Sequence, residues 1–363
     1  MRILILRFRL LGDIILTTPA VKLLRKHFPD AGIDYLVEPE WRGLVEGFPC
    51  INDVIVYDRV LMKKAPHEHI GFMTEMRKRH YDVAIDFHGG PRSGVVTRAT
   101  GAPLRIGYTG PQSIFFYNCR IKRNLRGFRF HSVMQQIRLL EPLGIHPGEM
   151  VPAVDMASPG EDSQSLVATL LRRAKESGYS GLASVHIPPQ NSFRNWGRDR
   201  VAAVAEGLAM RGLQPIFLGA EDSASLADDV SDSLQKAAVP VVGKTSVLDL
   251  RAIIAASRIF VGADSGPMHI AATTATPIVA LFGPNLPRIS GPWSSRATII
   301  EENLECRPCD QRRCIFGDHR CYGRIDSRRI LEAVDSRLEK HMEKVEPAAF
   351  LPAWLYGDPA CVV

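Results

Sequence analysis

The sequence predicts an α/β protein made of two doubly wound halves, each a parallel sheet with helices on both faces. Short apolar runs that fit buried strands alternate with segments of helical apolar spacing from the first residues onward. This alternation lapses once near the middle of the chain and then restarts. A length of 363 residues also exceeds what one ordinary hydrophobic core serves. Alternating strands and helices imply right-handed crossovers, and therefore parallel sheets.

The first half begins with a predicted strand and a long helix that Pro29 closes. Predicted strands are residues 3–6, 33–37, 54–57 and 83–87, and predicted helices are 13–28 and a segment around 71–79. Between residues 151 and 165 the pattern gives way to Pro, Ala, Gly, Asp and Ser, which indicates a linker. We therefore expect an N-terminal domain over residues 1–155.

The second half repeats the alternation. Predicted strands are residues 183–187, 215–218, 259–261 and 278–282, and predicted helices are 201–211, 247–256, 267–274 and 326–345. We expect a second domain over residues 166–325, followed by a helix and tail over 326–363. The apolar residues 348–363 are expected to pack on the protein rather than to touch a membrane. Ligands of such sheets bind beyond the carboxyl ends of the strands, so a cleft between the halves is the expected active site.

The composition is that of an ordinary globular protein, with 45% hydrophobic and 23% charged residues. No apolar run approaches the roughly 18 residues that would predict a membrane span. The apolar N-terminus contains Arg7, Arg9 and Asp13 and lacks a small-residue cleavage site. We therefore expect no signal peptide and a cytoplasmic location.

Positive charge is concentrated in one part of the chain, whose formal net charge is +6. Residues 87–140 contain no Asp or Glu. The same stretch contains Arg92, Arg98, Arg105, Arg120, Lys122, Arg123, Arg126, Arg129 and Arg138. Such a patch attracts phosphates, an anionic membrane surface or nucleic acid, although it could also be a solvated face. Nucleic acid is disfavoured because no helix-turn-helix, RNA-recognition or zinc-finger pattern accompanies it.

Residues 261–272 (VGADSGPMHIAA) are the most informative motif. They predict the end of a buried strand, a tight turn and the first turn of a helix. Ser265 and Gly266 stand where the helix begins, so backbone N–H groups and the positive end of the helix dipole form an anion site. His269 lies near one face of the same turn. A phosphate-bearing ligand fits this motif, and a simple capped helix is the alternative.

Asp13 follows the first predicted strand and Gly12, and it opens the first helix. This places a carboxylate at the carboxyl edge of the first sheet, where it could act as a general base. The alternative is a helix N-cap without further function. No Gly-x-Gly-x-x-Gly pattern follows the strand, which disfavours a dinucleotide-dependent oxidoreductase.

Two further candidates follow strands of the second half. Arg194 lies in the loop after the strand at 183–187, where a guanidinium group could neutralise a diphosphate. An ordinary surface arginine is the alternative. Glu221 or Asp222 follows the strand at 215–218 and could accept hydrogen bonds from a sugar hydroxyl, although helix capping explains both equally well.

Four of the seven cysteines, Cys306, Cys309, Cys314 and Cys321, form a C-x2-C-x4-C-x6-C pattern. Four close thiolates could bind zinc, but the spacing differs from that of paired C-x2-C knuckles. Reduced thiols or a local disulfide are therefore favoured over a structural metal. No cluster of His, Asp and Glu indicates a catalytic metal.

Several motifs in order resemble those of glycosyltransferase family 9, the lipopolysaccharide heptosyltransferases. They are residues 12–19 (GDIILTTP), 86–93 (DFHGGPRS), 105–108 (RIGY), 193–196 (FRNW), 264–269 (DSGPMH) and 277–284 (PIVALFGP). The resemblance covers nearly the whole chain and includes the cysteine segment. Residues 7–13 (RFRLLGD) and 193–196 are most similar to the subgroup of the third core heptosyltransferase.

The resemblance implies a GT-B fold, with two Rossmann-like domains facing a central cleft. It implies an ADP-heptose donor on the C-terminal domain, a lipid A-core acceptor on the N-terminal domain, and inversion without a metal or other cofactor. Asp13 matches the general base, and Asp264, Ser265, Gly266 and His269 match the diphosphate site. Arg194 stands where the family commonly has Lys, and Glu221 falls near the acid that contacts the ribose.

The acceptor's acidic groups would meet the basic patch, with Arg92, Arg120, Lys122 and Arg123 as the best candidates. The patch would also hold the protein against the anionic inner membrane, from its cytoplasmic face. The chain departs from the family pattern at Pro188 and Pro189 and at Asn285, which replaces a frequent Thr. Two alternatives remain, namely another nucleotide sugar (a hexose or hexosamine) on the same fold, and a non-catalytic protein that binds nucleotide sugars.

Overall fold

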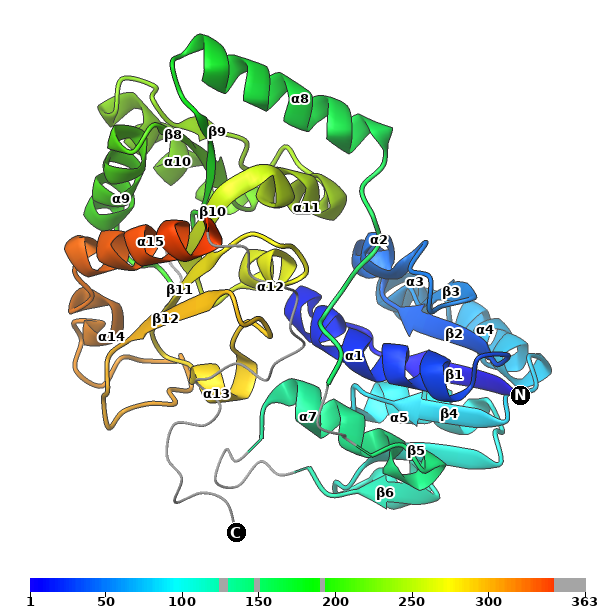
Figure 1. Cartoon of the computed structure of the whole chain (residues 1–363). Coiled ribbons are helices and arrows are strands. Elements are labelled where there is room, and N and C mark those ends of the chain that lie inside the picture. The colour runs from blue at the N-terminus through cyan, green and yellow to red at the C-terminus, as the bar shows by residue number, and fades with distance from the viewer. Residues whose placement is uncertain (124–129, 147–150, 190–192, 343–363) are drawn as a thin grey trace. The chain divides into compact units, whose positions relative to one another are not determined.

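Two six-stranded parallel sheets, wound in the same order, form the framework of the molecule (Figure 1). The computed structural model describes residues 1–123, 130–146, 151–189 and 193–342. The chain divides into two units, Met1–Ser158 and one that begins at Pro159. In the described ranges every strand pairing is parallel. The predicted α/β class with two doubly wound sheets is confirmed.

The first sheet has the order β3-β2-β1-β4-β5-β6. Its strands are β1 (Arg2–Leu6), β2 (Gly32–Val37), β3 (Asp53–Val56), β4 (Val83–Asp86), β5 (Leu104–Tyr108) and β6 (Cys119–Ile121). Its helices are α1 (Leu11–His27), α2 (Arg42–Val45), α3 (Arg59–Lys64), α4 (Pro66–Lys78), α5 (Pro91–Ala99), α6 (Ser113–Phe116) and α7 (Ser132–Ile137). Two 3₁₀ turns, η1 (Pro39–Trp41) and η2 (Arg138–Leu143), complete the unit.

The second sheet has the order β12-β11-β10-β7-β8-β9. Its strands are β7 (Gly181–His186), β8 (Leu213–Leu218), β9 (Val239–Pro240), β10 (Ser257–Ala263), β11 (Ile278–Phe282) and β12 (Ala297–Glu301). Its helices are α8 (Glu161–Glu176), α9 (Arg198–Met210), α10 (Ala224–Ser233), α11 (Val247–Ala256), α12 (Gly266–Ala272), α13 (Pro287–Ser290), α14 (Arg320–Gly323) and α15 (Ser327–Met342), with a 3₁₀ turn η3 (Glu221–Ser223).

Both faces of each sheet are buried, which is why the strands are continuous apolar runs. In β1, Leu4 and Leu6 face a cluster that contains Met76 of α4 and Val96 of α5. Ile3 and Ile5 point to the opposite face and are also fully buried. In the second unit, α9, α10 and α15 cover one face, and Ile330 and Val334 of α15 belong to that core.

Helix α1 carries Asp13 and contains an internal proline, Pro19. A proline cannot donate the hydrogen bond that the carbonyl group of Ile15 would receive in a regular helix. The hydroxyl group of Thr18 donates to that carbonyl at 2.7 Å instead. The helix therefore runs without a break from Leu11 to His27.

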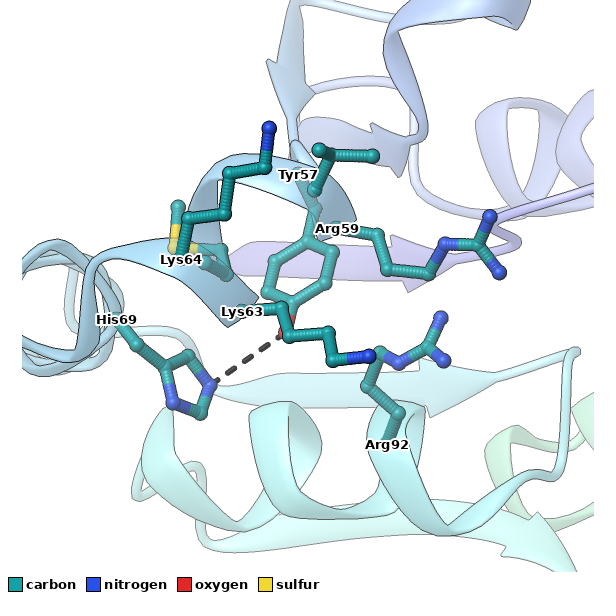
Figure 2. A pocket seen from close by; sticks show the side chains of 8 residues that line it. Tyr57, Arg59, Lys63, Lys64, His69 and Arg92 are labelled. Carbon is teal, nitrogen blue, oxygen red and sulfur yellow. Dashed lines mark hydrogen bonds between the residues drawn. The ribbon is translucent and has the colours of Figure 1, made fainter.

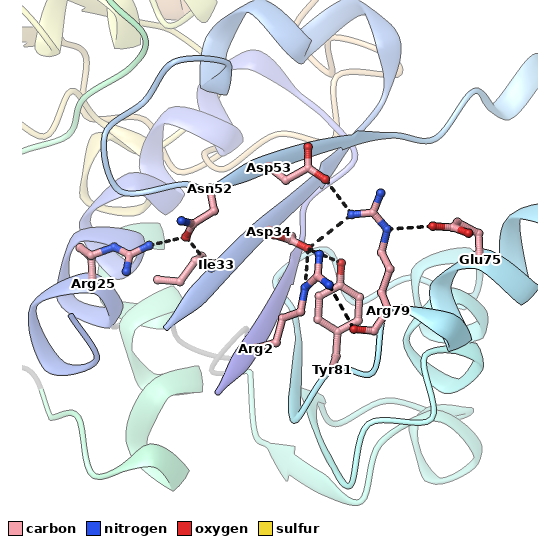
Figure 3. A network of polar contacts seen from close by, with 9 residues as sticks. All are labelled: Arg2, Arg25, Ile33, Asp34, Asn52, Asp53, Glu75, Arg79 and Tyr81. Atoms are coloured by element: carbon pink, nitrogen blue, oxygen red, sulfur yellow. Dashed lines mark hydrogen bonds and ion pairs between the residues drawn. The ribbon is translucent and has the colours of Figure 1, made fainter. Parts of the chain in front are cut away.

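The amino end of the first sheet is closed by a polar network around Asp34 of β2 (Figure 3). The Asp34 carboxylate, which is 2% exposed, accepts hydrogen bonds from Arg2 at 2.8 Å and from the Tyr81 hydroxyl at 2.6 Å. Arg79 lies 3.5 Å from Asp34 and also pairs with Asp53 at 2.7 Å and with Glu75 at 3.3 Å. Burial, followed by Asp34, raises the pKa of Tyr81. The buried charge of Asp34 is therefore balanced by Arg2 and Arg79, and the Tyr81 hydroxyl group donates to the same carboxylate.

The predicted elements agree with the structure where a long apolar run carried the signal. The strand at 278–282 and the helix at 247–256 have the predicted bounds, and the strands predicted in the first half shift by one residue at most. The expected linker is shorter than predicted, because α8 begins at Glu161. Strands β5, β6, β9 and β12 were not predicted. None of the helices in the described part is both long and apolar enough to cross a membrane.

Candidate functional site

Each sheet has a switch point, where the chain leaves two neighbouring strands toward opposite sides. In the first sheet these strands are β1 and β4, with Leu6 opposite Asp86. In the second sheet they are β7 and β10, with Val185 opposite Val261. A crevice forms beyond the carboxyl ends of such strands, and it is the usual ligand site of doubly wound sheets. The predicted Asp13 and Ser265 lie at these two places.

At the first switch point, Asp13 forms an ion pair with Arg7, the residue that follows β1. The guanidinium group of Arg7 is buried and donates to the carbonyl group of Phe87 at 2.5 Å. The Asp13 side chain is 38% exposed. The N-cap of α1 is Leu10, so the alternative reading of Asp13 as an N-cap is wrong. Arg7 instead fixes an accessible carboxylate at the sheet edge.

His88 follows β4 and lies beside this ion pair. Asp86, which is fully buried, orders its turn by accepting hydrogen bonds from the N–H groups of His88 and Gly89 at 2.8 and 2.9 Å. Burial, and then the charges of Arg7 and Arg9, lower the pKa of His88 to about 4. Its imidazole ring is therefore neutral near pH 7.

Two buried nitrogen atoms at this switch point have no hydrogen-bond partner in the part of the chain that the structure describes. They are Nδ1 of His88 and Nε of Arg7. Buried polar atoms without partners are costly, and they are rare in folded proteins. The accessible polar group at this switch point is therefore the Asp13 carboxylate, and these two nitrogen atoms lie buried beside it.

A basic cavity of about 720 Å³ lies beside α3, the helix that follows the edge strand β3 (Figure 2). Its lining residues include Arg59, Lys63 and Lys64 of α3, Arg92 of α5, Tyr57 and His69. Figure 2 shows that Arg59, Lys63 and Arg92 extend to the same side, whereas Lys64 points away. Among the described residues no carboxylate pairs with Arg59, Lys63 or Lys64, and Arg92 contacts Glu38 at 3.3 Å. This cavity can hold an anionic group.

The other three predicted acceptor-binding residues lie at the edge strand β6, at the far side of the sheet from β3. Arg120 lies on the edge strand β6, and Lys122 and Arg123 follow it; all three are exposed. The Arg123 guanidinium lies 4.5 Å from the ring centroid of Tyr108. The structure therefore separates Arg92, which lines the cavity beside α3, from the other three, which lie at and just after the edge strand β6. Arg126 and Arg129 lie outside the described residues.

At the second switch point, the hydroxyl group of Ser265 lies 3.2 Å from Nδ1 of His186 and donates to the carbonyl group of Ala263 at 3.0 Å. Ser265 precedes α12 without capping it through its side chain. Burial, and then the charge of Arg194, lower the pKa of His186 to about 4. Gly262 is needed here because a Cβ atom would lie 2.7 Å from the Cβ of His186.

The remaining predicted donor residues lie on loops of the same sheet edge. Arg194 is half-buried in the loop after β7. Burial raises the pKa of Tyr322, and the charge of Arg194 opposes that rise. Glu221 is exposed and follows the neighbouring strand β8. Asp264 is buried and accepts a hydrogen bond from the amide group of Asn285. Gly266 begins α12, and His269 is buried within that helix.

Several residues of these sites were missed by sequence reasoning, namely His88, His186, Arg59, Lys63 and Lys64. The two histidines had a usable signal, because each lies at or just after the end of a strand at a switch point. The cations of α3 had only the charge run R-V-L-M-K-K. The six described cysteines are unpaired, and no cluster of three metal-binding side chains occurs in the described ranges.

Comparisons with known proteins agree on one family. The model described as "Glycosyltransferase family 9 (heptosyltransferase)" matches residues 70–319. Lipopolysaccharide heptosyltransferase 3 of Escherichia coli is 27% identical over 298 residues, covering 78% of this chain and 84% of that protein.

Two solved structures show the same fold. A glycosyl transferase family 9 protein from Veillonella parvula has a TM-score of 0.81 at 22% identity, covering 93% of this chain and 97% of the other. The E. coli ADP-heptose lps heptosyltransferase II has a TM-score of 0.77 at 23% identity, covering 94% and 100%.

Proposed function

Since this chain belongs to glycosyltransferase family 9 and has the GT-B fold, we propose that it moves a heptose from ADP-heptose to the inner core of lipopolysaccharide. The reaction is one inverting displacement without a metal ion. The observation that carries this proposal is the Asp13 carboxylate, held by Arg7 at the first switch point and accessible to a ligand. A glycosyl transfer needs a base of this kind for the attacking hydroxyl group.

In the proposed reaction, Asp13 takes the proton of an acceptor hydroxyl group as its oxygen bonds to the anomeric carbon of the donor. The bond between that carbon and the diphosphate oxygen breaks, and the diphosphate leaves with the electron pair. Arg7 keeps the Asp13 carboxylate oriented. The imidazole ring of His88, neutral near pH 7, adds no competing positive charge beside this carboxylate.

The second switch point would hold the donor. Arg194 carries the positive charge that a leaving diphosphate needs, and Ser265 and Gly266 supply polar groups at the end of β10. Fixed donors and charges of this kind lower a barrier by about 3–4 kcal/mol each. Asp264 and His269 would belong to the same diphosphate site, and Glu221 would contact the ribose of the nucleotide. A solved relative whose name includes ADP-heptose supports this choice of donor.

The acceptor's acidic groups would bind on the first unit. The cavity of Arg59, Lys63, Lys64 and Arg92 is one anchor for a phosphate or carboxylate. The β6 edge with Arg120, Lys122 and Arg123 is a second anchor, or a contact with an anionic membrane surface. Asp13 lies between them along the sheet edge, so the attacked hydroxyl group would lie between the two anchored ends.

The test of donor and acceptor is direct. We expect the protein to release ADP from ADP-heptose only when a heptose-deficient lipopolysaccharide core is present. The lipopolysaccharide of cells that lack the protein should miss one heptose by mass analysis. If the protein instead turns over a nucleotide hexose or hexosamine, that sugar nucleotide is the donor and ADP-heptose is not. A failure to turn over any nucleotide sugar with native acceptor would favour a non-catalytic binding protein.

Arg194 tests the donor site separately. Arg194→Ala should raise the Kd for ADP by roughly 10- to 100-fold, because a charge-assisted contact with phosphate is worth roughly 1.5–3 kcal/mol. Isothermal titration calorimetry measures this Kd, and Arg198→Ala, an exposed arginine on α9, is the matched control. An unchanged Kd for the Arg194 variant would assign the diphosphate contact to another residue.

A further inference from the structure

Four thiols and three guanidinium groups line one cavity of about 370 Å³ in the second unit. The thiols are those of Cys306, Cys309, Cys314 and Cys321, and the guanidinium groups those of Arg307, Arg313 and Arg320. All four cysteines are unpaired and partly exposed. Across the described residues, no three metal-binding side chains come together to hold an ion. The cavity therefore presents unpaired, partly exposed sulfur beside guanidinium groups, of which Arg307 pairs with Glu301 and Arg320 with Asp318, and Asp310 also lines it.

Cys314 differs from the other thiols in its surroundings. Backbone N–H groups of His319, Phe316 and Gly317 donate toward its sulfur and lower its pKa. Burial has the opposite effect on Cys321, whose pKa is raised. The thiolate, not the thiol, is the nucleophile, so Cys314 is the thiol of this cavity best prepared to react. The Arg320 guanidinium, which stacks on Phe316 at 3.8 Å, stands beside it.

The cavity shares a wall with the second switch point. Phe193, the neighbour of Arg194, lines it, and its ring stacks on His319 with centroids 4.9 Å apart. Pro284 also lines it, and its carbonyl group accepts a hydrogen bond from the Cys309 N–H at 3.0 Å. The next residue, Asn285, donates its amide group to Asp264. Two loops of the switch point therefore form part of the thiol cavity.

The cysteine segment also holds Asn285 directly. Gln311 donates its amide to the side-chain oxygen of Asn285 at 3.0 Å, and the Gln311 N–H lies 3.4 Å from Sγ of Cys309. Arg307 donates to the backbone carbonyl of Asn285 at 2.5 Å and pairs with Glu301 at 2.7 Å. Displacing this segment would therefore release Asn285, and with it the hydrogen bond to Asp264.

We propose that this cavity is a covalent modification site for small-molecule disulfides, with Cys314 as the attacking thiol, and that its occupation weakens binding of the nucleotide donor. This inference rests on the proposed function, because it takes the residues around Asp264 as the donor site. The adduct fills the cavity and moves Phe193 and Pro284, the neighbours of Arg194 and Asn285.

The chemistry is one thiol–disulfide exchange. The Cys314 thiolate attacks one sulfur atom of the small disulfide, whose S–S bond breaks as a bond to Sγ of Cys314 forms. The departing small thiolate takes a proton from solvent. One protein thiol is oxidised to a mixed disulfide while half of the small disulfide is reduced to a thiol, so no other oxidant is needed. A small reducing thiol reverses the step.

The test uses the full chain and oxidised glutathione. Peptide mass spectrometry should find the first adduct on Cys314, forming at least about tenfold faster than on Cys50 and Cys119. These two are matched controls, because burial raises the pKa of both. The adduct should raise the Kd for ADP by about fivefold or more, and dithiothreitol should restore it. By linkage, saturating ADP should disfavour the exchange by the same factor.

The variant Cys314→Ser should keep the original Kd for ADP and lose its response to oxidised glutathione, with an unchanged unfolding temperature as the check on folding. Equal reactivity of Cys50 and Cys119 would overturn the modification site, as would a metal ion that the isolated chain holds on these thiols. An adduct on Cys314 with unchanged ADP affinity would overturn the coupling. If the unmodified chain binds no ADP, the donor assignment fails, while the adduct map still decides the modification site.

Discussion

The polar groups at the two ends of the first sheet have different surroundings. At the amino end, Asp34 is surrounded by Arg2, Arg79 and Tyr81, and each contributes a hydrogen bond or ion pair (Figure 3). At the carboxyl end, Arg7 and His88 each keep a buried nitrogen without a partner among the described residues. The first arrangement is complete within the fold, whereas the second leaves the Asp13 carboxylate accessible to a ligand. The comparison distinguishes Asp34, whose charge is used within the fold, from Asp13, which stays accessible at the carboxyl end of the same sheet.

The largest effect should come from removing the carboxylate at the carboxyl end. Asp13→Ala should lower kcat by about 10³-fold, because positioned general bases contribute roughly 10²–10⁴. The Kd for ADP should stay unchanged, whereas the unfolding temperature should fall, because the buried Arg7 guanidinium loses its ion-pair partner. Steady-state transfer assays and calorimetry measure these quantities. A fully active Asp13→Ala enzyme would remove Asp13 from the mechanism.

At the amino end the same kind of change should reduce stability instead. Asp34→Ala leaves Arg2, Arg79 and the Tyr81 hydroxyl without their buried acceptor, so the free energy of unfolding should fall by about 3 kcal/mol. Urea denaturation measures it. Asp53→Ala is the matched control, because this exposed partner of Arg79 should contribute less than about 1 kcal/mol. A loss of transfer activity in folded Asp34→Ala protein would contradict the division between the two ends.

The two neutral histidines predict how stability depends on pH. The pKa values of His88 and His186 fall from 6.5 to about 4 on folding, so between these values the unfolded chain binds more protons. Their contribution to stability is therefore complete above pH 6.5 and is lost as the pH falls toward 4, by at most about 1.4 kcal/mol per pH unit for each.

The corresponding measurement is chemical denaturation at pH values from 7 to 5. His88→Gln should make the dependence of unfolding free energy on pH shallower, because one of the two groups no longer titrates. The double variant with His186→Gln should flatten it further. An unchanged slope in the His88 variant would mean that this imidazole is as easily protonated in the folded protein as in the unfolded chain.

The smallest effect is expected at the basic cavity. Lys63→Ala should raise KM for the acceptor by about two- to fivefold and reduce its dependence on salt, because partly exposed charge contacts are weak and screened. Lys78→Ala is the matched control, since Lys78 is an exposed lysine at the end of α4 and does not line the cavity. Equal effects of the two substitutions would indicate a general electrostatic attraction rather than one anchored group.

The sequence predicted those parts of the fold that depend on local pattern. Helix α11 has its predicted bounds because Ser246 and Asp249 form a capping box before a helical apolar pattern. Strands β5 and β6 could not be predicted in the same way, since Arg105, Gly107 and Arg120 interrupt their apolar pattern. Their place is set by the pairing of β5 with β4 and of β6 with β5, tertiary contacts that no local pattern contains.

In the candidate site too, local pattern predicts some residues, whereas contacts between strands determine the rest. Asp13, Asp264 and Ser265 could be predicted because each follows a buried strand at a turn. The ion pair of Asp13 with Arg7 and the unsatisfied nitrogen of His88 could not, because burial and partners arise only when β1 and β4 meet. The predicted basic residues share a composition signal, yet the fold places Arg92 in the cavity beside α3 and Arg120, Lys122 and Arg123 at the edge strand β6.

Gly283 has a consequence for how this protein can change. A Cβ atom there would lie 2.1 Å from the Tyr322 ring, so the position accepts no side chain while the tyrosine keeps its place. Tyr322 in turn anchors the end of the cysteine segment by a hydrogen bond to the carbonyl group of Leu281 at 3.3 Å. The two positions therefore depend on each other. In related proteins we expect a larger residue at position 283 only where position 322 carries a smaller side chain than tyrosine.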